Sequence, residues 1–112
     1  MQRFKKIYPI LDIIRDNDQD RLMYLCKRYV VYGQVQGVGF RMFTLQVAKD
    51  LNLAGWVQNQ ATGSVEIIAC GPEQSMKEFE AKIAIGPDNA KVDRLIQEKC
   101  AAPNLNDFII KK

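Results

Sequence analysis

The chain has 112 residues, of which 47% are hydrophobic, 26% charged and 9% aromatic, which is the composition of one globular domain. Disordered, collagen-like and disulfide-dense chains are excluded, and a net charge of +3 is too small to indicate nucleic-acid binding by itself. The sequence contains no histidine, which excludes Ser-His-Asp catalysis, Cys-His catalysis and histidine-ligated zinc within this chain.

The first 22 residues have the pattern of an extension that lies outside the fold. Basic residues precede an apolar stretch, but Asp12 interrupts this stretch and no small-residue cleavage site follows, so it is not a secretion signal. Pro9 breaks the helical spacing of its apolar residues. No run of 18 apolar residues is present, and we therefore expect no membrane span and a single domain over residues 23–112.

The remaining chain predicts five strands and two helices. Runs of β-forming residues predict strands over 25–31, 56–57, 65–69, 90–98 and 108–110. Apolar residues at helical intervals predict helices over 40–53 and 73–85, ended by Gly55 and by Gly86-Pro87. The order β-α-β-β-α-β, followed by a short last strand, is that of an α+β, ferredoxin-like split βαβ sandwich. Two helices should cover one face of an antiparallel sheet.

A glycine-rich loop between the first strand and the first helix carries the strongest chemical signal. It reads GQVQGVGFR from Gly33 to Arg41. Gly37 and Gly39 allow positive φ angles and close backbone approach, so successive N–H groups can form an anion-binding nest at the helix N-terminus. Arg41 can grip two oxygens of one phosphate. Because neither Walker A nor GxGxxG is present, a plain glycine-rich loop with a solvated arginine is the alternative interpretation.

Asn59 is a second candidate, because it closes the second predicted strand. A side-chain amide both donates and accepts hydrogen bonds, and positioning a water molecule requires this. Taken alone, an asparagine at this place is more often a turn-forming residue.

Together these two segments resemble the signatures of the acylphosphatase family. Residues 31–41 match Gly-x-Val-Gln-Gly-Val-x-Phe-Arg, and residues 55–71 match Gly-aromatic-x-x-Asn with later glycines. The resemblance covers about residues 25–110. It implies hydrolysis of acyl phosphates to a carboxylate and inorganic phosphate, without metal or cofactor. It also implies phosphate binding by Gln36, Gly37, Val38, Gly39, Phe40 and Arg41, with the attacking water oriented by Asn59.

The same resemblance implies a ligand that is a small acyl phosphate, or a phosphate or sulfate anion. The wide spacing of the cysteines, the small net charge and the lack of a long apolar run predict a cytoplasmic protein that binds neither nucleic acid nor membrane, with a monomer as the default. The alternative is a catalytically silent acylphosphatase-like module that binds phosphate or RNA. Such a module would be expected to have lost Arg41 or Asn59, and both are present. The sequence therefore favours the enzyme.

The cysteines are far apart in the sequence, at positions 26, 70 and 100. In the fold that the resemblance implies, the first and third strands are antiparallel neighbours, so that Cys26 and Cys70 come side by side. A disulfide between them is geometrically conceivable, but two reduced, buried thiols are favoured in a cytoplasmic protein. Cys100 has no evident partner.

Overall fold

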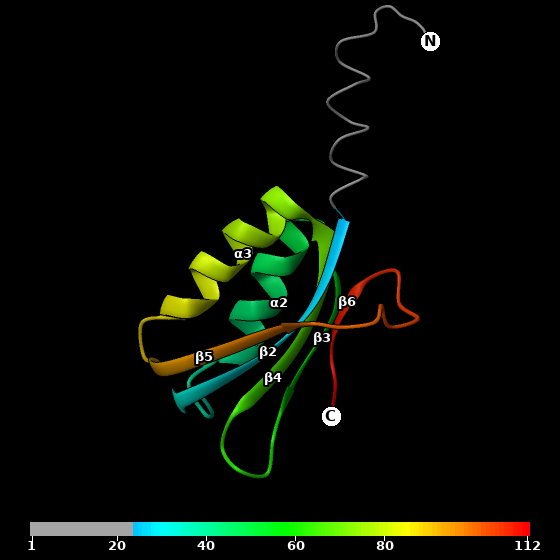
Figure 1. Ribbon diagram of the computed structural model, residues 1–112. Coiled ribbons are helices and arrows are strands. Elements are labelled where there is room, and N and C mark those ends of the chain that lie inside the picture. Colours follow the sequence, from blue (N-terminus) through cyan, green and yellow to red (C-terminus); the bar gives the residue numbers. More distant parts are fainter. Residues whose placement is uncertain (1–23) are drawn as a thin grey trace, which may run out of the picture.

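The computed structural model describes residues 24–112, in which two helices pack on one face of a five-stranded sheet (Figure 1). The strands are β2 (Tyr24–Gln34), β3 (Ala54–Asn59), β4 (Val65–Pro72), β5 (Lys91–Lys99) and β6 (Phe108–Ile110), and the helices are α2 (Phe40–Asp50) and α3 (Glu73–Ile85). The expected extension over residues 1–22 lies outside this range. Within the range, no helix is long and apolar enough to cross a membrane.

The strands follow the order β5-β2-β4-β3-β6 in the sheet. β2 pairs antiparallel with β4 and β5, and β3 pairs antiparallel with β4. This arrangement confirms the ferredoxin-like prediction. The sheet departs from the expected antiparallel pattern at one edge, where β6 runs parallel to β3. Because residues 100–107 reverse the chain after β5, β6 runs opposite to β5 and in the same direction as β3.

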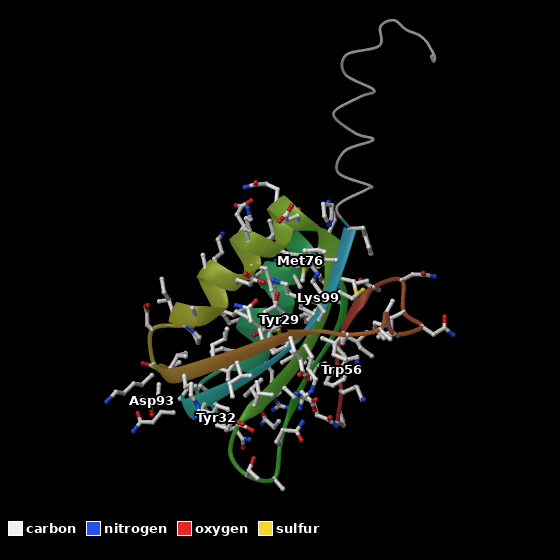
Figure 2. All side chains as sticks on the ribbon, in the orientation of Figure 1. Tyr29, Tyr32, Trp56, Met76, Asp93 and Lys99 are labelled. Atoms are coloured by element: carbon white, nitrogen blue, oxygen red, sulfur yellow. A yellow bond between two sulfur atoms is a disulfide. The ribbon has the colours of Figure 1, made fainter. Side chains whose placement is uncertain are left out.

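The core lies between the sheet and the two helices. Side chains alternate across a strand, so Tyr29 and Val31 of β2, both 0% exposed, point toward the helices. The ring of Phe79 on α3 lies 5.8 Å from that of Tyr29 and 6.3 Å from that of Phe108 on β6. The alternate residues of β2, including Tyr32, lie on the opposite face, which we call the open face, with Trp56 of β3 (Figure 2).

The helix α2 ends three residues before its predicted end. Asn52 adopts a left-handed φ of 57°. Its N–H donates to the carbonyl of Lys49, and the N–H of Leu53 donates to the carbonyl of Ala48. This pair of bonds is a Schellman motif, which ends the helix without a glycine. Gly55, the expected terminator, lies instead within β3.

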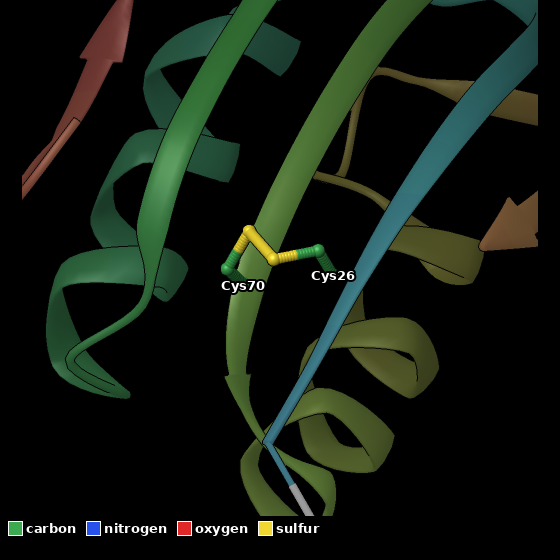
Figure 3. Close-up of a disulfide and its surroundings, with 2 residues drawn as sticks. All are labelled: Cys26 and Cys70. Carbon is green, nitrogen blue, oxygen red and sulfur yellow. A yellow bond between two sulfur atoms is a disulfide. The ribbon is translucent and has the colours of Figure 1, made fainter. Parts of the chain in front are cut away.

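Cys26 and Cys70 are joined in a disulfide between β2 and β4 (Figure 3), whereas the sequence favoured two reduced thiols. The two residues face each other in the register of the strands, with their Cα atoms 4.1 Å apart. The carbonyl of Cys26 accepts a hydrogen bond from the N–H of Cys100, on the side of β5. The pair with Cys70 is therefore the non-hydrogen-bonded type, in which the side chains lie closest.

Candidate active site

A cavity of about 220 Å³ opens where the loop after β2, the start of α2, the end of β3 and β6 meet. Its walls contain five of the site residues predicted from the sequence, namely Gly37, Gly39, Phe40, Arg41 and Asn59. The fold therefore brings both predicted signatures to one place, although they are separated along the chain by a whole helix. Gln36 and Val38, also predicted to bind phosphate, are not part of the cavity wall.

The loop presents backbone N–H groups that have no hydrogen-bond partner in the described part of the chain. Gly37 and Gly39 adopt left-handed φ angles of 74° and 80°, and Gly39 forms the N-cap of α2 without a side-chain cap. Among the loop and cap hydrogen bonds of residues 24–112, none uses an N–H of residues 36–42 as donor. The first turn of α2 contains no acidic residue. Free donors at the positive end of a helix form a site for an anion.

Arg41 lies in the first turn of α2 and lines the same cavity. No ion pair found between residues 24 and 112 involves its guanidinium. The five donors of an arginine side chain suit the oxygens of a phosphate, which two of them can bind side by side. The loop amides and Arg41 therefore present their hydrogen-bond donors to one cavity.

Asn59 ends β3, opposite Val65 of β4. Its Oδ1 atom is buried and accepts no hydrogen bond from the described part of the chain. A buried polar atom without a partner costs about 1–3 kcal/mol, and native proteins retain few of them. Asn59 also lines the cavity of Arg41 and the loop, so a residue with an unpartnered acceptor belongs to the cavity wall.

The side chain of Gln36 makes two hydrogen bonds within the protein, in addition to the phosphate contact predicted for its backbone N–H. Its Nε2 donates to the carbonyls of Gln60 and Ser64, at 2.8 and 2.9 Å. Both acceptors belong to the turn between β3 and β4, directly after Asn59. The side chain therefore fastens the loop to the turn that holds Asn59, while the N–H of Gln36 stays among the free donors described above.

Three apolar residues of the cavity wall were missed by the sequence analysis, namely Val35, Met42 and Ile110. Met42 is 61% exposed and borders the cavity directly after Arg41. Ile110 reaches the site because β6 lies along β3 at the sheet edge. Nothing in its local sequence indicates this contact, whereas the place of Met42 next to Arg41 could have done so.

Comparisons with known proteins agree with this geometry. A model of the acylphosphatase family matches residues 27–110. An acylphosphatase of Koribacter versatilis is 42% identical over 86 residues, which make up 76% of this chain and 78% of that protein. An acylphosphatase of Aeromonas salmonicida is 46% identical over 78 residues, or 70% of this chain and 87% of that protein.

The fold of this chain also resembles that of a relative whose structure has been solved. The crystal structure of the acylphosphatase from Bacillus subtilis superposes with a TM-score of 0.76 at 37% sequence identity, and the match covers 79% of this chain and 99% of that one. These relatives favour the enzyme over a silent binding module. The chain belongs to the acylphosphatase family and is a hydrolase of acyl phosphates.

Proposed function

We propose that the loop amides of residues 36–41 and the guanidinium of Arg41 hold the phosphoryl group of the acyl phosphate, and that Asn59 orients the attacking water. The unpartnered Oδ1 of Asn59 carries this proposal, because it is a buried acceptor on the same cavity wall as Arg41. A water molecule that donates a hydrogen bond to this oxygen turns a lone pair toward a phosphorus held by the loop.

In the proposed reaction the water oxygen attacks phosphorus, and the bond between phosphorus and the acyl oxygen breaks. The carboxylate leaves with the bonding electrons, and a phosphate oxygen takes the proton of the water. A carboxylate is a good leaving group, so the step needs little acid-base assistance. Fixed donors around the equatorial oxygens stabilise the transition-state charge, as in other phosphoryl transfers. A flat pH-rate profile across the second ionisation of the phosphate would contradict the proton transfer.

The experiment compares two variants, with benzoyl phosphate as substrate and inorganic phosphate as a competitive ligand. We expect Arg41→Ala to weaken phosphate binding and to lower kcat by about 10²–10³-fold. Asn59→Ala should lower kcat by a similar factor and leave phosphate affinity nearly unchanged. Equal loss of phosphate affinity in both variants would contradict the water-orienting role of Asn59.

We further propose that the reaction needs no metal and that the protein acts as a cytoplasmic monomer without a nucleic-acid partner. The donors named above are all backbone amides or one guanidinium, and this supports metal independence. The rate should be the same before and after treatment with EDTA. Loss of activity on chelation, with recovery on addition of Mg²⁺, would contradict it.

A further inference from the structure

The three cysteines of the chain lie in one row, on β2, on β4 and directly after the end of β5. Cys26 on β2 is opposite Cys70 on β4. The register of β2 with β5 ends at the pair Lys27–Lys99. Cys100 follows directly, and its N–H donates to the carbonyl of Cys26 at 3.1 Å, which continues the ladder by one residue. Paired residues of an antiparallel ladder point their side chains to the same face. Cys26 therefore stands between two cysteines, one on each side.

Both neighbours suit a disulfide with Cys26. The pair with Cys70 already has one. The pair with Cys100 is hydrogen-bonded, and such pairs have Cα atoms about 5.5 Å apart. This spacing lies in the middle of the range of about 4.4–6.8 Å that disulfides span. Cys100 is a free thiol of intermediate exposure, whereas Cys70 is 2% exposed.

We propose that Cys100 is an exchange thiol, which attacks the Cys26–Cys70 disulfide and moves the crosslink from the β2–β4 pair to the β2–β5 pair. The strand order β5-β2-β4 places the attacking and the leaving sulfur on opposite sides of Cys26. Thiol–disulfide exchange requires an attack of this kind, because the incoming sulfur displaces the leaving one from the far side.

The exchange needs no external oxidant or reductant. The thiol of Cys100 loses its proton, and its sulfur forms a bond to Sγ of Cys26. The bond between Cys26 and Cys70 breaks, and Cys70 leaves as a thiolate that takes up a proton. One disulfide and one thiol are present before and after the step.

The charges around Cys100 set the pH at which the exchange runs. Burial, followed by the carboxylate of Glu98, raises the pKa of the Cys100 thiol, and Arg28 opposes this shift. Tyr24 and Tyr32 on β2, Glu66 on β4 and Arg94 on β5 also lie on this face. The charge of Cys100 is in turn one cause of the raised pKa of Tyr29. Because only the thiolate attacks, exchange should be slow at neutral pH and should accelerate as the pH rises toward the raised pKa.

The test follows which cysteine is free in the oxidised full-length protein. The protein is incubated without reductant at about pH 9, near the ordinary thiol pKa, and samples are blocked with N-ethylmaleimide. Tryptic cleavage after Lys27, Lys77 and Lys99 puts the three cysteines on three peptides. We expect the label to start on Cys100 and to move to Cys70 over minutes to hours, while a Cys26–Cys100 peptide pair replaces Cys26–Cys70.

Two variants complete the test. In Cys100→Ser the Cys26–Cys70 pair should persist, with at least about tenfold less label on Cys70. In Cys70→Ser, mild oxidation should give an intramolecular Cys26–Cys100 bond at a rate independent of protein concentration. The proposal is overturned if the label stays on Cys100 in the wild type, or if the new crosslinks join Cys70 to Cys100 or two chains.

Discussion

Two arginines of this molecule differ in whether carboxylates bind their guanidinium groups. Arg28 lies on the open face of the sheet, where Glu66 of β4 and Glu98 of β5 bind its guanidinium, the latter at 3.2 Å. The hydrogen bond to Glu66 is the main cause of its raised pKa. Arg41 lines the cavity and has no carboxylate partner among residues 24–112. Arg28 serves to join three strands, whereas the donors of Arg41 stay available to a ligand.

The same contrast separates two sets of hydrogen-bonding side chains. In the core, the hydroxyl of Tyr29 donates to Glu80 at 2.7 Å, and Lys27 donates to the same carboxylate at 2.9 Å. In Asn59, which lines the cavity, Oδ1 has no partner among residues 24–112. Among residues 24–112, the one buried side-chain atom without a partner and the free amides of the loop lie at the same end of the sheet. The lack of partners thus marks the site more clearly than residue type does.

The largest effect on activity is expected when Arg41 is replaced by lysine, with the same replacement at Arg28 for comparison. Arg41→Lys should lower kcat/KM for benzoyl phosphate by about 10²–10³-fold, because an ammonium cannot reproduce the two-pronged grip on phosphate. Its free energy of unfolding should stay unchanged. Arg28→Lys is the matched control and should keep full activity with a loss of stability within about 1 kcal/mol. Similar values of kcat/KM in both variants would contradict the proposal that Arg41 binds the ligand whereas Arg28 serves the fold.

The next effect concerns Gln36, which joins the two halves of the site. Gln36→Glu turns a donor into an acceptor that faces two carbonyls, so we expect a loss of about 1–3 kcal/mol in urea unfolding, together with lower kcat. Gln58→Glu is the control, because Gln58 donates to the carbonyl of Lys112 at an exposed position. If both variants unfolded at the same urea concentration, the role of the Gln36 bridge would be refuted.

A third effect appears only at alkaline pH. Burial and the bond to Glu80 raise the pKa of Tyr29. The unfolded tyrosine titrates near pH 10, so the stability from the protonated hydroxyl is complete below that pH and is lost as pH rises toward the folded-state pKa. The wild type should lose about 1.4 kcal/mol per pH unit more than Tyr29→Phe above about pH 10. Equal slopes for the wild type and Tyr29→Phe above about pH 10 would contradict the role of the Tyr29 hydroxyl.

The smallest effect is expected at Asp107. The N–H of Phe108 and the ammonium of Lys49 lower the pKa of this carboxylate. A lowered pKa gives stability that is present above the unfolded pKa and lost as the pH falls through the folded one. Asp107→Asn should therefore lower the Tm at neutral pH by no more than about 2 °C, and at low pH the two proteins should melt together. A persistent difference at low pH would show that the carboxylate charge is not the cause.

Local patterns in the sequence predicted most of the fold. The second helix begins at Glu73 and ends at Ile85 as predicted, because its apolar stripe and its glycine-proline stop are both local. The end of α2 was missed because Asn52 replaced the usual glycine in the left-handed position. The direction of β6 could not be predicted, since it depends on how residues 100–107 cross between the sheet edges.

Only the site residues that lie within the two signature motifs were predicted from the sequence. Arg41 and Asn59 lie on one cavity as expected, but their chemical roles remain predictions. The bridge from Gln36 and the contact of Ile110 depend on tertiary packing between distant segments. For the same reason Cys100 had no evident partner in the sequence, although the register of β5 places it beside Cys26.

The position of β6 also determines when this enzyme becomes complete. The cavity is lined by residues from Val35 to Ile110, and the N–H of Lys111 donates to the carbonyl of Val57 to hold the last strand in place. During synthesis, the loop and Asn59 leave the ribosome well before β6, which supplies Ile110 to the cavity wall. In a growing chain, the phosphate-binding loop is therefore present early. The cavity is complete only after residue 110 has been made. Fragments that stop before β6 should bind and turn over substrate poorly, even with both signatures intact.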